Sequence, residues 1–273
     1  MTFPAYAADF AALDASCTSY ICVEAQTGLI VAEQNADERR APASMVKLMQ
    51  MLLVAEGVRE GTIDLNMPIP ISAEAQRMGG TQVWLKQGDE FPLHLMMRAV
   101  AVASANDAAL AVAEGVWGSR EEYLKQANKR AQELGMLDTE FHSPHGLPPE
   151  QGQSPDLSTA RDLAKLAQQC VLESQLMEWV GQKDLQFKPN LPVKENTNKL
   201  LSMLPECDGL KTGYTRAAGF CLTATASRGG IRLISVVMGC DRLSTRFDAS
   251  KVLLEDSFAQ VRKVKYFEPG QRL

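Results

Sequence analysis

A continuous apolar stretch with one charge constrains this chain more than any other feature. Residues 41–55 read APASMVKLMQMLLVA, and Lys47 is the only charged side chain among them. A helix that is apolar almost all round is normally buried, whereas a lysine is rarely fully buried without a partner. The stretch is therefore either a core helix whose lysine extends to the surface, or a buried helix that places a desolvated amine beside the hydroxyl of Ser44.

The composition is that of a globular protein with ample core. The chain has 273 residues, of which 45% are hydrophobic and 22% are charged. This length suits one large domain or two small ones, and the absence of repeats or low-complexity linkers favours one. The net charge of −5 and the lack of lysine or arginine runs argue against nucleic-acid binding. No apolar run reaches the roughly 18 residues that a membrane span requires.

The pattern of elements predicts an α+β fold. Residues 19–35 read as two strands joined by a turn at residues 26–28, and a second hairpin is centred on Gly229 and Gly230. Residues 64–90 look irregular because prolines and glycines interrupt any period. Helices are expected over residues 44–58, 92–103, 107–116, 119–134, 158–172 and 244–264. Strands at both ends with helices between them predict one antiparallel sheet, built from both chain ends, with helices on its faces and a helical insertion.

The cysteines and histidines do not predict a metal site. Six cysteines form no CxxC pair, and only three histidines are present. Isolated cysteines are most simply small core residues, although one disulfide is possible in an exported protein and its connectivity cannot be read from the sequence. No metal or organic cofactor is expected. The cysteines are Cys17, Cys22, Cys170, Cys207, Cys221 and Cys240.

The first of three short polar strings is Ser44-Met45-Val46-Lys47. Residues three apart share a helix face, and a helix start offers free N–H groups and a positive dipole end to an oxyanion. Burial lowers the pKa of a lysine amine from about 10.4, so a neutral Lys47 can take the proton of Ser44 and create a nucleophile. Taken alone, the string favours a capping serine with a solvent-reaching lysine.

The second and third strings are polar as well. Ser104-Ala105-Asn106 lies between two predicted helices, where Ser104 can relay a proton and the Asn106 amide can bind a peptide group; alone, it reads as an ordinary polar loop. Lys211-Thr212-Gly213 precedes the last hairpin. An edge strand of this kind can pair with an extended peptide while its cation and hydroxyl hold a carboxylate, and its glycine permits close approach of the substrate. Alone, it reads as a solvated strand edge.

Together, and in this order, the strings are far more specific. S-x-x-K, S-x-N and K-T-G are the signature of β-lactamases and penicillin-binding proteins. The chain resembles the D-alanyl-D-alanine carboxypeptidases, which are low-molecular-mass penicillin-binding proteins, from about Tyr20 to Tyr266. The segments VAEQNADERRAPASMVK, SANDA and KTGYTRAAG carry this resemblance. So does FHSPHGL, whose HGL part β-lactamases lack. One departure is Ala105, where the family often has glycine.

The resemblance implies a β-lactamase/transpeptidase-like fold and a role for each matching residue. Ser44 would be the acylated nucleophile, Lys47 its general base and Ser104 a third catalytic residue. The backbone N–H groups of Ser44 and Tyr214 would form an oxyanion hole. The substrate-binding set that the resemblance implies is Asn106, Lys211, Thr212, Gly213, Tyr214, Arg246, His145 and Leu147, with Lys211, Thr212 and Arg246 at the terminal carboxylate.

The implied activity is removal of the terminal D-Ala from peptidoglycan stem peptides, with β-lactams as covalent inhibitors. A DD-endopeptidase that cuts cross-links would use the same residues. A β-lactamase is disfavoured because no E-x-x-L-N segment, which would activate the deacylating water, occurs between Ser104 and Lys211. A non-catalytic sensor is disfavoured because all three strings are intact.

The chain ends lead to expectations about location and domains. The string AYA before Ala8-Asp9 resembles the tail of a signal-peptide cleavage site, so we expect an exported protein, in the periplasm or on the outer face of the cytoplasmic membrane. Residues 1–18 would be an N-terminal segment, residues 19–266 the catalytic domain, and residues 267–273 a stub where a second β-rich domain begins in many relatives. Any membrane association would come through such a C-terminal part.

Overall fold

The structure, a computed structural model, describes residues 13 and 15–262. Several expectations therefore lie wholly or partly outside the described residues. They are the leader remnant within residues 1–18, the domain limit at residue 266 and the segment 267–273. The expectation that the last helix reaches residue 264 is wrong, because this helix ends at Gln260 and Val261 is extended.

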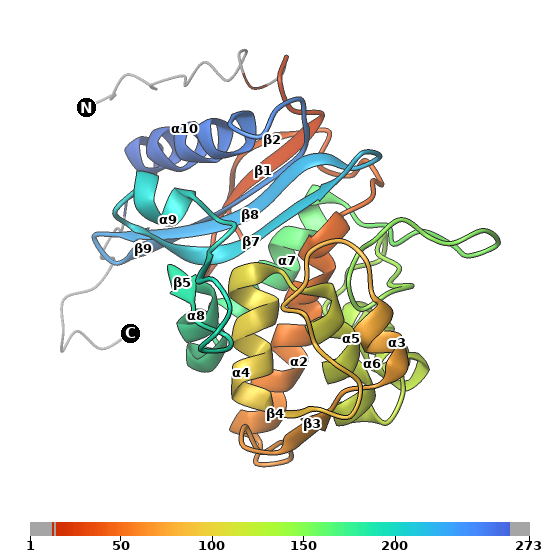
Figure 1. The fold of residues 1–273 in the computed structure, drawn as a ribbon. Helices are drawn as coiled ribbons and strands as arrows, with labels where there is room; N and C mark the ends of the chain where they lie inside the picture. The colour runs from red at the N-terminus through yellow and green to blue at the C-terminus, as the bar shows by residue number, and fades with distance from the viewer. Residues whose placement is uncertain (1–12, 14, 263–273) are drawn as a thin grey trace, which may run out of the picture.

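A five-stranded antiparallel sheet forms one layer of the molecule (Figure 1), in the order β2-β1-β9-β8-β7. Strands β1 (Ser19–Glu24) and β2 (Ile30–Gln34) form the N-terminal hairpin, and β7 (Cys207–Thr215), β8 (Gly219–Arg228) and β9 (Ile231–Cys240) come from the other end of the sequence. Strand β1 pairs with β9, with Val23 opposite Ile234. The predicted sheet, split between the chain ends, is confirmed, and the strand that carries Lys211 lies at its edge.

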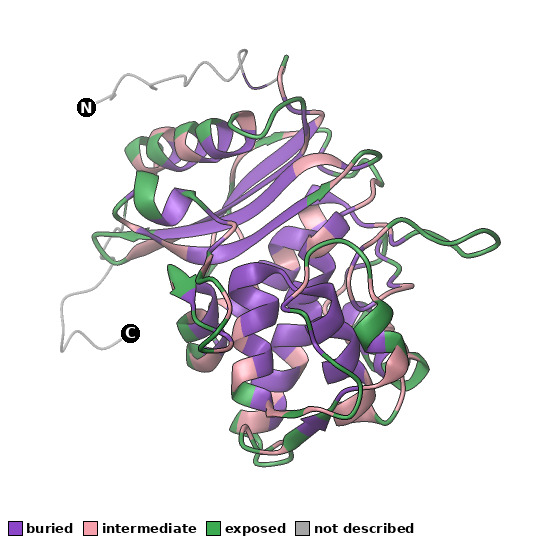
Figure 2. Ribbon diagram, in the orientation of Figure 1, coloured by how far each residue is buried: buried purple, intermediate pink, exposed green. Residues whose placement is uncertain are grey.

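Helices cover both faces of this sheet (Figure 1). Helix α10 (Thr245–Gln260) and the short α9 (Leu200–Met203) cover one face, and α2 (Lys47–Arg59), α7 (Ala160–Cys170) and α8 (Ser174–Val180) lie on the other side. The central strands are consequently buried along most of their length (Figure 2). Alternate side chains of β9 enter separate cores, since Leu233 and Val237 face α10 whereas Ile234 and Val236 face the helical layer.

The helices predicted from periodicity are present with small shifts of their ends. The apolar stretch begins as a 3₁₀ turn, η1 (Ala43–Val46), and continues as α2. The others are α4 (Leu93–Arg98) with the π-helical turn η2 (Ala99–Ala103), α5 (Asn106–Trp117), α6 (Arg120–Glu133) and α7. Ser119 caps α6 by accepting a hydrogen bond from the Glu122 N–H over 3.1 Å, and Thr159 caps α7 in the same way through Asp162.

The prediction that residues 64–90 are irregular is wrong in part. Strand β3 (Pro68–Pro70) pairs with β4 (Glu90–Pro92), and the one-turn helix α3 (Ala73–Arg77) lies between them. Prolines are tolerated in such a short two-stranded ribbon because their missing N–H groups fall on an outer edge. Helix α8 and the hairpin of β5 (Asp184–Leu185) with β6 (Lys194–Glu195) were not predicted either.

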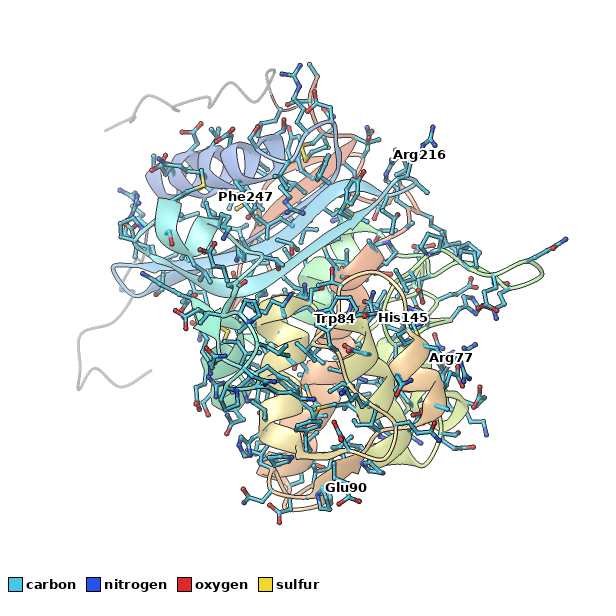
Figure 3. The ribbon with its side chains drawn as sticks, in the orientation of Figure 1. Arg77, Trp84, Glu90, His145, Arg216 and Phe247 are labelled. Atoms are coloured by element: carbon cyan, nitrogen blue, oxygen red, sulfur yellow. A yellow bond between two sulfur atoms is a disulfide. The ribbon has the colours of Figure 1, made fainter. Side chains whose placement is uncertain are left out.

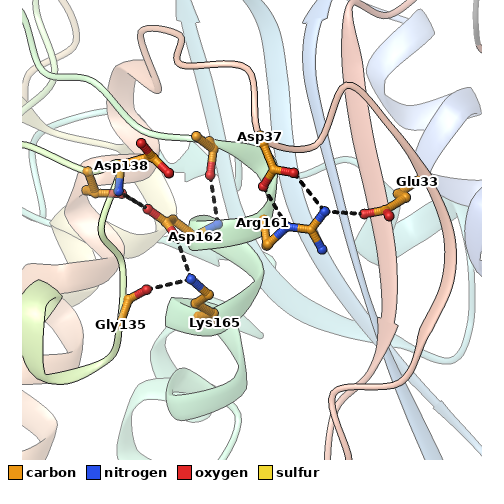
Figure 4. A network of polar contacts seen from close by, with 9 residues as sticks. Glu33, Asp37, Gly135, Asp138, Arg161, Asp162 and Lys165 are labelled. Atoms are coloured by element: carbon orange, nitrogen blue, oxygen red, sulfur yellow. Dashed lines mark hydrogen bonds and ion pairs between the residues drawn. The ribbon is translucent and has the colours of Figure 1, made fainter.

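Charged side chains at the start of α7 tie two distant segments together (Figure 4). The Arg161 guanidinium bonds to Asp37 at 2.6 Å and to Glu33 at 2.7 Å, on the segment that leads to Ser44. The next residue, Asp162, accepts from the Asp138 N–H at 2.9 Å and from Lys165 at 2.8 Å. Helix α7 thereby fixes the approach to η1 relative to the segment that leads to His145.

One disulfide joins the two ends of the sheet. Cys17, just before β1, is bonded to Cys240 at the end of β9. The interpretation of all six cysteines as isolated core residues is therefore wrong for this pair. The interpretation holds for the four cysteines that are buried and form no disulfide, which are Cys22, Cys170, Cys207 and Cys221. No helix within residues 13 and 15–262 is long and apolar enough to cross a membrane.

Candidate active site

The start of the apolar stretch brings Ser44 to the boundary between the sheet and the helical layer. Ala43 adopts a left-handed conformation (φ +49°), and the chain then turns into η1, so that Ser44 lies at the helix start. Met45 and Val46 are fully buried and Ser44 is half-buried. The Ser44 hydroxyl donates to the His145 carbonyl over 3.3 Å. Burial of its neighbours thus fixes a partly accessible hydroxyl in one place.

Lys47 does not extend to the surface. Its side chain is fully buried, and its Nζ lies 2.9 Å from Ser44 Oγ, 2.8 Å from Asn106 Oδ1 and 2.8 Å from the His145 carbonyl oxygen. A neutral amine can keep its two N–H groups on the Asn106 and His145 acceptors, and its lone pair can accept the Ser44 proton when that hydroxyl turns away from the His145 carbonyl. Of the two alternatives for the apolar stretch, the structure shows the desolvated amine beside a hydroxyl.

Burial holds the pKa of Lys47 well below its usual value, and the positive charge of Lys211 lowers it further. The carboxyl groups of Asp156 and Asp107 act in the opposite direction. The net direction favours a neutral amine, which is the form of lysine that can accept a proton from a hydroxyl.

The second string enters the site through Asn106, the first residue of α5. Besides contacting Lys47, its side-chain amide donates to the Gly79 carbonyl over 2.8 Å, and its backbone N–H donates to Thr81 over 2.8 Å. Ser104 is 6% exposed and adopts a left-handed conformation (φ +58°) between η2 and α5. Within the described residues, its hydroxyl is not hydrogen-bonded to Ser44 or Lys47.

Asp107 fixes the loop that frames Asn106, and sequence reasoning assigned it no role. Its buried carboxylate accepts from the Val83 N–H at 3.1 Å and the Leu85 N–H at 3.1 Å. Between these residues Trp84 is held at φ +60° with its side chain in solvent. The position of Asp107 directly after Asn106 was the only signal in the sequence.

The HGL segment supports the nucleophile through its backbone. The His145 carbonyl oxygen accepts hydrogen bonds from the Lys47 amine and the Ser44 hydroxyl. Gly146 packs against the turn itself, because a Cβ at this position would lie 2.1 Å from the Ala43 carbonyl oxygen. Leu147 flanks Gly80 on the neighbouring loop. The glycine between His145 and Leu147 is thus required by close backbone approach, a role that sequence reasoning did not assign.

A buried carboxylate also holds the HGL segment. Asp156 accepts from the His142 N–H at 2.6 Å and from the Ser143 N–H and hydroxyl at 2.9 and 2.6 Å. Burial, followed by the charges of Lys47 and Arg120, lowers the pKa of His145 to about 3. A ring that stays neutral near pH 7 agrees with the expectation that His145 shapes the site rather than moving protons. Asp156 had no signal in the sequence.

The third string, Lys211-Thr212-Gly213, lies on β7, which packs against η1. Lys211 is fully buried, and burial, with the Arg246 charge second, lowers its pKa to about 7. The Thr212 hydroxyl donates to Thr197 Oγ1 over 2.7 Å. Arg246 at the start of α10 reaches the same strand, because its guanidinium donates to the Gly213 carbonyl over 3.1 Å. The side chains of Lys211, Thr212 and Arg246 therefore gather on or beside β7.

The expected reason for Gly213 needs correction. A Cβ at this position would lie 2.6 Å from the Pro42 carbonyl oxygen, so the glycine permits β7 to approach the turn before Ser44. Tyr214, the next residue, is exposed and its ring stacks on Phe220 with centroids 4.3 Å apart. Thr197, which contacts Thr212, is a further residue beside β7 that sequence reasoning did not identify.

The arrangement offers the parts for acyl transfer. A hydroxyl and a buried amine lie in hydrogen-bond contact at a helix start, and the cationic side chains of Lys211 and Arg246 lie on or beside β7, where an anion can bind. Within the described part of the chain, no group of three or more histidine, cysteine or acidic side chains is placed to hold a metal ion.

Comparisons with known proteins agree with this geometry. A sequence model of the D-alanyl-D-alanine carboxypeptidase family matches residues 6–242. The D-alanyl-D-alanine carboxypeptidase DacF of Bacillus subtilis is 38% identical over 256 residues, which are 93% of this chain and 65% of that protein. The chain thus spans less than two thirds of the length of this relative.

Solved structures show the same fold. Penicillin-binding protein 5 of Haemophilus influenzae superposes with a TM-score of 0.83 at 31% identity, covering 89% of this chain and 71% of that one. Penicillin-binding protein D2 of Listeria monocytogenes, in its ampicillin-bound form, gives 0.79 at 29% identity, covering 89% and 97%. The predicted α+β, transpeptidase-like fold is confirmed, and the chain belongs to the D-alanyl-D-alanine carboxypeptidase family of serine peptidases.

Proposed function

We propose that this protein is a serine-type D-Ala-D-Ala carboxypeptidase that removes the terminal D-Ala from peptidoglycan stem peptides through an acyl-enzyme on Ser44. The observation that carries the proposal is the 2.9 Å contact between Ser44 Oγ and the Nζ of a lysine with no exposed surface. Membership of the family supports the choice of substrate.

The steps of the proposed reaction rest on the contact between Ser44 and Lys47 and on the roles that the family resemblance implies. Ser44 Oγ attacks the carbonyl carbon between the two D-Ala residues as its proton passes to Lys47 Nζ. The backbone N–H groups of Ser44 and Tyr214 stabilise the negative oxygen of the tetrahedral intermediate. The proton then passes through Ser104 to the leaving amine, the C–N bond breaks, and D-Ala departs. Water hydrolyses the remaining ester and regenerates the Ser44 hydroxyl.

The region around Lys211 and Arg246 is suited to the terminal carboxylate of the substrate. Lys211 and Arg246 are buried cations, and within the described residues neither forms an ion pair with an acidic side chain. A buried cation without a counter-ion is unfavourable, so the binding of a carboxylate there is more favourable than the same ion pair in water. Thr212 and the backbone beside Gly213 complete this subsite, with Asn106, His145 and Leu147 forming the opposite wall.

The same chemistry should make β-lactams covalent inhibitors, since their strained amide carbonyl would acylate Ser44. We expect the adduct to be hydrolysed slowly, because the sequence has no E-x-x-L-N segment between Ser104 and Lys211 that would activate a deacylating water.

Export from the cytoplasm is part of the proposal. The Cys17–Cys240 disulfide supports it, because disulfides persist in oxidising compartments such as the periplasm and the cell exterior. The catalytic domain would comprise residues 19–266.

Release of D-Ala from peptides tests the function directly. The purified protein should liberate D-Ala from a pentapeptide that ends in D-Ala-D-Ala, and Ser44→Ala should not. Equal release by both proteins, or none by either, would contradict the proposal. Faster cleavage of a cross-linked peptide dimer than of the pentapeptide would identify an endopeptidase, and rapid steady-state hydrolysis of penicillin a β-lactamase.

A further inference from the structure

A polar pocket of about 340 Å³ adjoins the site on the side of the HGL segment. Its walls come from α3, the HGL segment and the first residue of α6 (Figure 3). Several residues of the site also line this pocket, and two of them contact central side chains of the site directly. The Gly79 carbonyl accepts from Asn106, and the His145 carbonyl accepts from Lys47. His145 therefore connects the pocket with the candidate nucleophile, because it lines the pocket and its carbonyl contacts both Ser44 and Lys47.

Arg120 lines this pocket and donates no hydrogen bond to the residues that the structure describes. Its Nε is buried and has no hydrogen-bond partner among the residues that the structure describes. The carboxylates nearest to its guanidinium, those of Glu74 and Glu121, lie 3.9 and 3.8 Å away. These separations exceed a hydrogen bond. Arg77 adds a second, exposed guanidinium to the same pocket (Figure 3).

The ring of His145 adds a neutral donor on the wall that separates the pocket from the site. Its Nδ1 accepts from the Leu147 N–H over 3.1 Å, which places the proton of the neutral ring on Nε2. Arg120 lines the same pocket, and its charge contributes to the lowered pKa of this ring.

The acidic residues leave the hydrogen-bonding capacity of these donors open, although Glu74 and Glu121 form long ion pairs with Arg120. Asp156 is already engaged by three donors from His142 and Ser143. Glu74 and Glu150 are exposed at the rim, where water solvates their charges. The interior therefore offers a guanidinium and an imidazole N–H without a fixed acceptor.

We propose that this pocket binds a carboxylate in the acyl part of the peptide substrate, with Arg120 as its principal ligand. The inference rests on the proposed function. If the terminal carboxylate lies at Lys211 and the scissile carbonyl at Ser44, the upstream peptide leaves Ser44 on the opposite side, towards His145 and the pocket. A guanidinium binds a carboxylate through two parallel hydrogen bonds, which selects an acid over its amide.

Paired substrates test this inference. N-acetylated pentapeptides ending in D-Ala-D-Ala are prepared with glutamate or glutamine at each of the three upstream positions in turn. For at least one position, the wild-type protein should cleave the glutamate peptide about tenfold more efficiently in kcat/KM. Arg120→Gln should abolish this preference while changing kcat/KM for the glutamine peptide by less than twofold.

Lys129→Gln provides the matched control, because it removes an exposed cation from the same helix α6 away from the pocket. It should keep the preference intact. Absence of any glutamate preference in the wild type, or its persistence in Arg120→Gln, would overturn the inference while leaving the proposed function standing. Absence of D-Ala release from every peptide would overturn both.

Discussion

Lys47 Nζ lies 2.9 Å from Ser44 Oγ, although none of the lysine side chain is exposed. The same burial that makes the charged amine unfavourable also makes the neutral amine available near pH 7. The contact depends on three chain segments far apart in sequence, since Asn106 and the His145 carbonyl hold Nζ in position.

Replacing the base with a permanently charged group should abolish acylation. Lys47→Arg replaces a neutral amine by a guanidinium that cannot lose its proton, so we expect the rate of acylation by labelled penicillin to fall by about 10²–10⁴-fold, the usual contribution of a general base. Lys129→Arg, on the exposed face of α6, should react at the wild-type rate. Acylation of Lys47→Arg at a rate near the wild type would exclude Lys47 as the base.

Activity should decline as pH rises through neutrality. Lys211 must be protonated to hold a carboxylate, and its pKa is lowered to about 7, so kcat/KM for a peptide substrate should fall above that pH. Lys47 must be neutral, and burial lowers its pKa in the direction that favours this form. Lys211→Arg should move the fall to higher pH because a guanidinium stays charged. A profile that is flat from pH 6 to 9 in the wild type would contradict this role.

Gly146 and Gly152 offer a matched pair of substitutions. Both have positive φ, but a Cβ on Gly146 would meet the Ala43 carbonyl oxygen at 2.1 Å, whereas nothing lies within 4 Å of one on Gly152. Gly152→Ala should cost only about 1–2 kcal/mol of backbone strain and acylate normally. Gly146→Ala should displace the turn that carries Ser44 and slow acylation by at least tenfold. Equal acylation rates in the two folded variants would show that this packing does not position the nucleophile.

The disulfide should contribute measurably to stability. Cys17 and Cys240 are 223 residues apart, and a bond that closes so long a loop typically stabilises a fold by about 2–5 kcal/mol. A reductant should therefore lower the thermal midpoint of the wild type. It should have no effect on the double variant Cys17→Ser/Cys240→Ser, whose midpoint should already be low. An unchanged midpoint of the wild type in reductant would contradict this contribution.

The parts of the site that could be predicted are those that depend on residues close together in the sequence. Ser44 and Lys47 share a helix face, and Lys211 lies on a strand beside a plain hairpin, so local patterns and the family resemblance together identified them. The chain topology then follows from strands at both ends with helices between them.

What the sequence did not reveal depends on contacts between distant backbone groups. Asp107 and Asp156 bind amide hydrogens of loops, and any residue except proline can supply an amide. Gly213 was assigned to substrate approach, but the Pro42 carbonyl that it accommodates lies 171 residues away in sequence. The elements β3, α3 and β4 were missed because each has only three to five residues, too few to show a period.

The pairing of Cys17 with Cys240 likewise follows from the sheet rather than from the spacing of cysteines. Strand β1 lies beside β9, with Ser19 opposite Met238, so the ends of the two strands meet. Six cysteines allow several pairings, and only this register brings one pair together.

Intact-mass spectrometry after incubation with benzylpenicillin tests the central claim most directly. The wild-type protein should gain the mass of one penicillin molecule, and Ser44→Ala should remain unmodified under the same conditions. An adduct that persists in Ser44→Ala would contradict the assignment of Ser44 as the nucleophile, and the absence of an adduct on the wild type while the drug stays intact would contradict the acyl-transfer chemistry itself.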